Sequence, residues 1–223
     1  MFDRIAHRYD LLNRLLSFGT DVRWRKKMAM RLSDKSYPMI LDLATGTCDQ
    51  LISLHKNTSI EKAIGVDRSY GMLEIGQQKI DELKLNDKIT LVQGDATALP
   101  LASNEFNAVT ISFGIRNVID VEAGLKEMAR ILKPGGKCLI LEFGLPKNVI
   151  IRSSYLFYFR YILPLIGGLI SGDSYAYNYL NKTVETFPYG NNFCELMEKS
   201  GFKTVSAKAL TLGVAYIYEG GKA

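Results

Sequence analysis

Two features of the sequence have residue types that suit ligand binding, and each stands where a predicted strand ends. Asp67 ends the apolar run Ala63–Asp67, and a turn of small residues, Ala44–Cys48, follows the apolar run Met39–Leu43. Open α/β sheets bind ligands at the carboxyl ends of their strands, and an acid after the second strand accepts hydrogen bonds from the two hydroxyls of a ribose. The sequence therefore predicts a nucleoside site with Asp67 on the ribose. The other interpretation of Asp67 is a cap for a helix that starts at Ser69.

The composition of the turn narrows the choice of ligand. A loop that binds a dinucleotide has three spaced glycines, which allow the backbone to approach a pyrophosphate. Ala44, Gly46 and Cys48 stand at the corresponding positions, so one glycine remains. S-adenosylmethionine has a ribose and an adenine but no phosphate, and it therefore fits this turn better than NAD does.

The elements that must position these residues alternate between apolar runs and helix-like segments. This alternation predicts a Rossmann-like α/β fold, with a mostly parallel seven-stranded sheet and an antiparallel C-terminal hairpin. Strands are predicted at Met39–Ala44, Ala63–Asp67, Ile89–Gln93, Ala108–Ser112 and Gly136–Phe143, helices at Ser69–Leu85 and Val121–Leu132, and the hairpin at Phe202–Ala209 and Gly213–Tyr218. We predict a single domain over residues 1–223, with an N-terminal helical cap (1–31) and an apolar insert (146–189) outside the alternation.

The composition is that of an ordinary globular chain. Its 223 residues suffice for one well-buried domain, and 47% hydrophobic residues argue against extensive disorder. The three cysteines have no metal-binding spacing, so we expect no metal site and a reduced, cytoplasmic setting. A net charge of +5 suits an anionic membrane surface or no particular partner. The basic cluster Arg23–Lys27 is most simply the solvated face of a helix, and without an aromatic-interleaved stripe it indicates no nucleic acid.

The insert contains an apolar run, Tyr155–Ile170, that does not predict a membrane span. The run is shorter than the ~20 residues that a span needs. Arg160, Pro164, Gly167 and Gly168 also interrupt it. A core helix pair, a lid over an apolar substrate and a membrane-surface element remain open as interpretations.

Several motifs carry a resemblance to known enzymes. LDLATGT at Leu41–Thr47, the acid Asp67, GDA at Gly94–Ala96 and LKPGG at Leu132–Gly136 together resemble a class I S-adenosylmethionine-dependent methyltransferase. Tyr9–Trp24, Thr110–Val118 and Arg130–Phe143 are similar to the signatures of the quinone C-methyltransferases of menaquinone and ubiquinone synthesis. The likeness runs from Phe2 to Tyr218. Ala44 and Cys48 depart from the residues common in that family, but both are small.

The resemblance implies a set of contacts to S-adenosylmethionine. Gly46 and Thr47 are expected along its methionine part, in the same turn as Ala44. Asp42 either orients this turn or meets the ammonium group, and Asp49 is equally well a residue that starts the next helix.

Further cofactor contacts follow from the later motifs. Asp95 and Ala96 resemble the family pair that faces adenine, although Asp95 as plain sequence is equally a turn residue. Ser112 resembles a cofactor contact at a strand end, where an ordinary hydroxyl is the alternative. Tyr9 is expected to pack on the cofactor from the N-terminal segment.

The resemblance also implies methyl transfer to a ring carbon of a polyprenylated quinol. Carbon is a poor nucleophile unless a neighbouring hydroxyl loses its proton, and a fixed cation stabilises the resulting phenolate in a dry pocket. We expect Arg116 and Asn117 to be catalytic, and His7 to be a candidate base. The alternatives are a surface Arg in a loop and a solvated His.

The sequence leaves several points open. The signatures serve both demethylmenaquinol, which would give menaquinol, and the methoxy-polyprenyl-benzoquinol of ubiquinone synthesis. A nucleic-acid methyltransferase is disfavoured because SFGIRN at Ser112–Asn117 replaces the Asn/Asp-Pro-Pro-aromatic loop of amino-group enzymes. A catalytically silent cofactor-binding or membrane-associated module is the rival from another class. Transient contact with the inner face of the membrane and a homodimer are further options.

Overall fold

A computed structural model of the chain describes residues 2–34, 36–165 and 174–223. The strands of these residues form one seven-stranded sheet in the order β3-β2-β1-β4-β5-β7-β6. Their bounds are β1 Met39–Leu43, β2 Lys62–Asp67, β3 Ile89–Gln93, β4 Phe106–Ser112, β5 Leu132–Phe143, β6 Lys203–Leu210 and β7 Ala215–Gly221. Strands β1 to β5 pair in parallel, whereas β7 is antiparallel to both β5 and β6. The predicted fold class and hairpin are confirmed.

The strand that departs most from prediction is β5, which begins at Leu132 rather than Gly136. Leu132 pairs with Phe106 and Lys137 pairs with Ala108, so an irregularity in the register absorbs the residues between them. Gly135 has a φ of 73°, a conformation that glycine adopts without steric cost. The motif that predicted a turn is therefore a bulge inside a longer strand.

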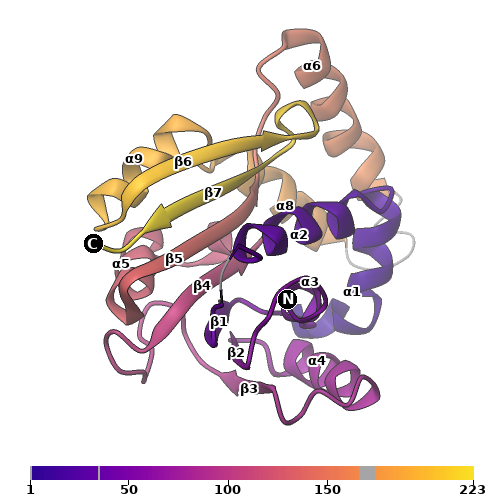
Figure 1. Cartoon of the computed structure of the whole chain (residues 1–223). Helices are drawn as coiled ribbons and strands as arrows, with labels where there is room; N and C mark the ends of the chain where they lie inside the picture. The colour runs from indigo at the N-terminus through magenta and orange to yellow at the C-terminus, as the bar shows by residue number, and fades with distance from the viewer. Residues whose placement is uncertain (1, 35, 166–173) are drawn as a thin grey trace.

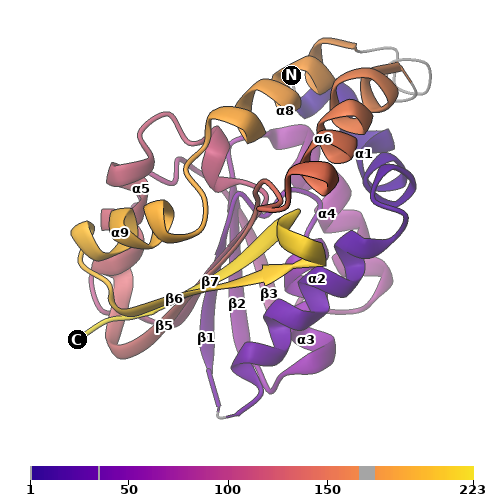
Figure 2. The ribbon, with the colours of Figure 1, turned by 90° about the horizontal axis from the view of Figure 1, so that it is seen from above.

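Helices cover both faces of the sheet (Figure 2). Their bounds are α1 Phe2–Leu16, α2 Thr20–Ala29, α3 Asp49–Asn57, α4 Tyr70–Glu82, α5 Val121–Ile131, α6 Val149–Phe157, α8 Ser174–Thr186 and α9 Asn191–Lys199. One core joins α2, α3 and α4 to the sheet through side chains such as Met28, Leu51 and Ile80. The other core joins α5 and α9 to the opposite face through Met128 and Phe193. Both faces are buried, as a parallel sheet requires.

A third cluster of buried side chains lies at the carboxyl ends of the parallel strands. It joins Leu12 of α1 and Met72 of α4 to Phe159, Leu163 and Val184 of the insert. The insert consists there of α6, the π-helical turn η3 (Tyr158–Ile162) and α8, which Figures 1 and 2 show beside α1. The cap and the insert, which are far apart in the sequence, thus meet over one end of the sheet.

The apolar run that begins at Tyr155 is helical as far as Leu165, and residues 166–170 of the run lie outside the described residues. Within the described ranges, no helix has both the length and the apolar character to cross a membrane.

Candidate active site

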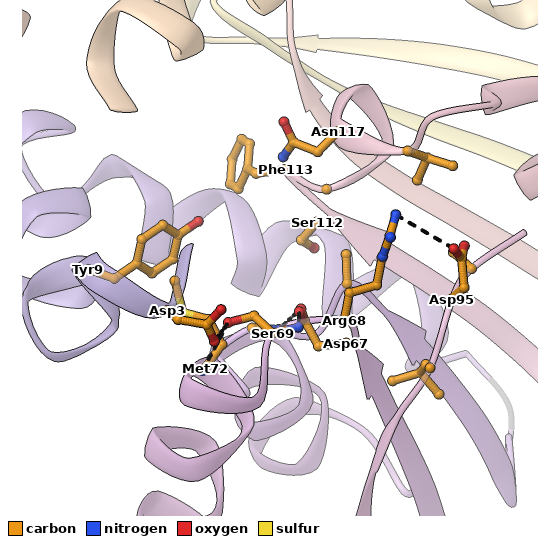
Figure 3. A pocket seen from close by; sticks show the side chains of 17 residues that line it. Asp3, Tyr9, Asp67, Arg68, Ser69, Met72, Asp95, Ser112, Phe113 and Asn117 are labelled. Atoms are coloured by element: carbon orange, nitrogen blue, oxygen red, sulfur yellow. Dashed lines mark hydrogen bonds and ion pairs between the residues drawn. The ribbon is translucent and has the colours of Figure 1, made fainter. Parts of the chain in front are cut away.

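A cavity of about 440 Å³ opens at the carboxyl ends of β1, β2 and β4, and we call it the strand-end cavity (Figure 3). The predicted cofactor-site residues among its lining are Tyr9, Ala44, Gly46, Asp67, Asp95, Ala96 and Ser112, together with the predicted catalytic Asn117. The sequence places these residues in separate turns, and the parallel order of the strands brings the turns to one edge.

Asp67 joins two of these turns. Its Oδ2 accepts a hydrogen bond from the backbone N–H of Gly46 at 2.8 Å, and its Oδ1 accepts one from Ser69 N at 2.8 Å. The helix cap is the Ser69 hydroxyl, which accepts from Met72 N, so Asp67 is not the cap. Burial raises the pKa of Asp67 above its ordinary value. A carboxylate has about four acceptor sites, so both oxygens can still accept hydrogen bonds from a ligand.

Asp95 stands on the far side of the cavity from Tyr9 (Figure 3). Its Oδ1 accepts hydrogen bonds from the backbone N–H and the hydroxyl of Thr97, which makes it a turn residue as the simpler interpretation held. These bonds lower the pKa of Asp95. Its Oδ2 lies 3.6 Å from Nη1 of Arg68, so the carboxylate faces both the turn and the cavity.

The turn after β1 has an unusual backbone that its small residues permit. Ala44, Gly46 and Cys48 have φ values of 46°, 56° and 67°. Gly114 faces this turn, because a Cβ built on it would lie 2.5 Å from the Ala44 Cβ. The left-handed turn and the close approach of Gly114 therefore shape this wall of the cavity.

Asp42 and Thr47 lie beneath the strand-end cavity and are not among the residues that line it. Asp42 is 1% exposed and accepts hydrogen bonds from the hydroxyls of Thr45 and Thr110. Burial raises the pKa of Asp42 to about 6. Of its two predicted roles, this geometry fits the orientation of the turn. The Thr47 hydroxyl donates to Asp10 Oδ1 at 2.6 Å, which connects the turn to α1.

Polar contacts, which the sequence did not indicate, hold α1 over this site. Asp3 accepts from the Ser69 hydroxyl at 2.7 Å and from Gly71 N at 2.8 Å. Asp10 also pairs with Lys79 of α4. Asp49 is at the start of α3, as its alternative interpretation held, and its carboxylate pairs with Arg14 and Lys79. The cap is thereby bound to both the turn and α4.

A second cavity of about 300 Å³, which we call the aromatic cavity, adjoins the first. Its aromatic lining comes from α1, α2, β5, the insert and the segments between them: Tyr9, Phe18, Trp24, Phe113, Phe143, Tyr155, Tyr158 and Phe159. Tyr9 and Phe113 line both cavities, so the two share a wall. The basic cluster Arg23–Lys27 does not lie entirely on the surface. Arg25 is buried against the Phe113 ring, whereas Arg23, Lys26 and Lys27 are exposed.

Arg116 lines the aromatic cavity and its side chain is 7% exposed, so it is not a surface arginine. Its Nη1 donates to Phe113 O and to Oε1 of the fully buried Glu142, both at 2.7 Å. The guanidinium lies 5.3 Å from the centroid of the Phe143 ring. Its Nε is buried and lacks a hydrogen-bond partner in the part of the chain that is described, as does Oδ1 of Asn117. Unpaired buried polar atoms are rare and indicate a place where a ligand can bind.

Glu142 was not predicted, although the sequence contained a signal. It is a lone acid in the apolar run Cys138–Phe143, and a charge in a buried strand requires a partner. His7, in contrast, is exposed on α1 and lines neither cavity. Ser112 lines the strand-end cavity and donates to Gln50 Oε1 at 3.1 Å.

Known proteins resemble this chain over its whole length. A family model described as the ubiE/COQ5 methyltransferase family matches residues 1–222. The ubiquinone/menaquinone biosynthesis C-methyltransferase of Syntrophotalea carbinolica is 46% identical over 99% of this chain and 92% of its own. The demethylmenaquinone methyltransferase of Thermus thermophilus is 43% identical over 99% of both chains.

Solved structures agree on the fold. A SAM-dependent methyltransferase from Aquifex aeolicus has a TM-score of 0.65 at 15% identity, over 89% of each chain. At that identity the likeness concerns the fold alone, whereas the sequence matches extend through both cavities. The chain belongs to the ubiE/COQ5 methyltransferase family.

Proposed function

We propose that this protein transfers a methyl group from S-adenosylmethionine to the ring of demethylmenaquinol and so produces menaquinol. The observation that carries the proposal is the shared wall of Tyr9 and Phe113, because it joins a cavity lined by the Asp67 carboxylate to an aromatic cavity lined by the buried Arg116 guanidinium. The names of the relatives include both demethylmenaquinone and ubiquinone/menaquinone methylation, so the methoxy-polyprenyl-benzoquinol is the second candidate substrate.

The strand-end cavity suits the cofactor, which supplies an electrophilic methyl group on a sulfonium. Asp67 would accept from the ribose hydroxyls with the acceptor sites that Gly46 and Ser69 leave open. Asp95 and Ala96 would face the adenine. Ala44, Gly46 and Ser112 would surround the methionine part from the β1 turn and the end of β4, and Tyr9 would cover it from α1. Thr47 would act from beneath by joining the turn to Asp10 of α1. Asp42 would act beneath the site by holding Thr45.

The aromatic cavity suits the quinol. A hydroxyl next to the accepting carbon loses its proton, and the resulting phenolate increases the electron density on that carbon. The carbon then forms a bond to the methyl as the bond from sulfur to methyl breaks, and loss of the ring proton restores the aromatic ring. Arg116 would stabilise the phenolate through its unpaired Nε, in a site where burial strengthens the interaction. Asn117 would hold a water or hydroxyl at the junction of the cavities.

The reaction also needs a group that takes the proton from the quinol hydroxyl. His7 was the candidate, but its exposed position outside both cavities means that it could act only through a rearrangement of α1 or through water. Asn117, whose Oδ1 has no partner among the described residues, is better placed to orient a water that takes the proton.

We further propose that the protein contacts an anionic membrane surface where the substrate tail enters. Phe18 lines the aromatic cavity and is 82% exposed, and its ring lies 6.3 Å from that of Tyr158. Phe157 and Leu165 of the insert are also exposed. These exposed apolar side chains and the exposed Arg23, Lys26 and Lys27 of α2 suit a lipid surface, since apolar burial and attraction to anionic lipids add together.

Transfer itself is tested with purified protein, methyl-labelled S-adenosylmethionine and a demethylnaphthoquinol kept reduced. We expect label in the organic phase, and a benzoquinol acceptor in parallel determines the preferred ring. Calorimetry with adenosylhomocysteine and with NAD accompanies the assay. Binding of adenosylhomocysteine without transfer to either quinol would instead identify a silent binding module, and binding of NAD alone would overturn the cofactor assignment.

Membrane contact is tested by flotation with vesicles that contain anionic lipid. Phe18→Glu and Phe157→Glu should reduce the floated fraction. Leu83→Glu is the matched control, because Leu83 is 44% exposed at the end of α4 that leads away from the strand-end cavity. Equal flotation of all variants would contradict the proposed surface.

A further inference from the structure

The hydroxyl of Tyr155, a residue that lines the aromatic cavity, is buried without a hydrogen-bond partner among the described residues. Its neighbour Tyr158 lines the same cavity but donates its hydroxyl to Leu16 O at 2.9 Å. Leaving a buried hydroxyl unpaired costs about 1–3 kcal/mol. A protein that retains such a hydroxyl at the wall of a cavity has a stability cost with no structural return, which points to a bound molecule as the missing partner.

The surroundings of Tyr155 connect it to the proposed phenolate site. Its ring centroid lies 4.8 Å from that of Phe159, which lies 6.1 Å from that of Phe143. The Phe143 ring in turn packs against the Arg116 guanidinium. The Tyr155 hydroxyl and Arg116 Nε are thus two polar atoms on one aromatic wall that have no hydrogen-bond partner among the described residues. One comes from the insert and the other from the segment after β4.

The two groups differ in charge. Arg116 is a permanent cation. Burial raises the pKa of Tyr155 above its ordinary value, so this hydroxyl stays neutral and keeps its proton. A quinol has two ring oxygens in para positions, and only the oxygen next to the accepting carbon must become an anion. The cation suits that oxygen, and a neutral hydroxyl suits the other.

We propose that Tyr155 is the hydrogen-bond partner of the second ring oxygen of the quinol, the one next to the carbon that bears the prenyl tail. This inference rests on the proposed function. Tyr155 is then a specificity-determining residue: it holds the ring so that the accepting carbon, rather than the prenylated one, faces the strand-end cavity. The insert accordingly contributes a polar contact to the ring as well as an apolar surface to the tail.

The first test compares Tyr155→Phe with Tyr158→Phe, which removes one hydroxyl from each of two cavity tyrosines. Tyr155→Phe should lower kcat/KM for a short-tailed demethylnaphthoquinol about tenfold, the value of one neutral hydrogen bond. Its melting temperature should be equal to or above that of the wild type, because the substitution removes no hydrogen bond to the described residues, and adenosylhomocysteine affinity should be retained. Tyr158→Phe should show a lower melting temperature and a smaller change in kcat/KM.

The second test uses a substrate in which the same contact is sterically hindered: the monomethyl ether at the oxygen next to the prenylated carbon, whose methyl group stands in the way of the Tyr155 hydroxyl, with the other hydroxyl free. The wild type should prefer the quinol over this ether, and Tyr155→Phe should lose most of that preference. The ratio of the four kcat/KM values isolates the contact between hydroxyl and oxygen.

Three results would overturn the inference. Unchanged kcat/KM in Tyr155→Phe would show that the hydroxyl does not contact substrate. A lower melting temperature together with weaker adenosylhomocysteine binding would show a structural role. An undiminished preference for quinol over ether would exclude this oxygen as its partner. All three are read against a wild type that methylates the quinol, and a wild type inert towards both quinols would overturn the proposed function and this inference together.

Discussion

Glu142 Oε1 lies 2.7 Å from Arg116 Nη1, and the two side chains form an ion pair that is almost completely buried. The same oxygen accepts a hydrogen bond from Phe143 N at 2.8 Å, and Oε2 accepts one from the backbone N–H of Arg116 at 3.5 Å. The pair fixes the guanidinium, whereas its Nε has no hydrogen-bond partner in residues 2–34, 36–165 and 174–223. Glu142 is therefore a positioning residue for the group that we propose to stabilise the phenolate.

Replacing this pair with apolar residues should separate folding from catalysis. Arg116→Ala alone leaves a buried carboxylate without its cation, a change that costs about 3–5 kcal/mol of folding free energy. The double variant Arg116→Met/Glu142→Leu should instead melt near the wild-type temperature and bind adenosylhomocysteine with the wild-type dissociation constant, yet transfer no methyl group. Thermal unfolding, calorimetry and the label assay measure the three properties. Equal loss of turnover and cofactor affinity would contradict the role of Arg116.

Asp67→Asn should weaken cofactor binding specifically. The substitution removes the charge that strengthens the ribose hydrogen bonds, which are worth about 1.5–3 kcal/mol, so the dissociation constant of adenosylhomocysteine should rise roughly 10- to 100-fold. Asp81→Asn is the control, because Asp81 is an exposed residue of α4. Wild-type affinity of the Asp67→Asn variant in calorimetry would contradict the assignment of the ribose to this carboxylate.

Gly114→Ala should disturb the turn after β1, and a second substitution should repair it. The added Cβ would lie 2.5 Å from the Ala44 Cβ, and the forced shift should cost about 1–3 kcal/mol and weaken cofactor binding. Ala44→Gly in the same chain removes the opposing carbon and suits the φ of 46°. The double variant should therefore recover both stability and affinity. Additive losses in this cycle would show that the two residues do not interact.

Asp42 should make stability depend on pH in an unusual direction. Its pKa in the folded protein, about 6, exceeds the ordinary value of 3.8, so the folded state binds more protons than the unfolded state between these values. Its contribution to stability therefore decreases as pH rises from about 4 to about 7, by on the order of 3 kcal/mol. Asp42→Asn lacks this titration. The free energy of unfolding of the wild type minus that of the variant, from denaturant titrations, should fall over this window, and a constant difference would contradict the prediction.

The sequence predicted those parts of the molecule that depend on local patterns. Period, turn chemistry and motif predict the five parallel strands, the hairpin and the residues that follow the strand ends. Asp67, Gly46 and Asp95 accordingly line one cavity at those ends. The bulge in β5 was missed because its glycines also suit a turn. The insertion of β7 between β5 and β6 depends on pairing that no local pattern specifies.

Contacts between distant segments account for most of what the sequence did not reveal. Asp10 reaches Thr47 and Asp3 reaches Ser69 only because α1 folds back over the sheet. Arg25 belongs to a cluster that the sequence interprets as a solvated helix face, but its guanidinium is buried 5.2 Å from the centroid of the Phe113 ring. The unpaired hydroxyl of Tyr155 is likewise invisible in sequence, where it is one aromatic residue in an apolar run.

The wall formed by Tyr9 and Phe113 has a thermodynamic consequence. A ligand in one cavity that fixes the rotamers of these two rings also fixes the shape of the other cavity, because both rings line both cavities. By linkage, S-adenosylmethionine changes the affinity for the quinol by the same factor as the quinol changes the affinity for S-adenosylmethionine. Through these two aromatic rings, the dissociation constant of each substrate thus depends on whether the other substrate is bound.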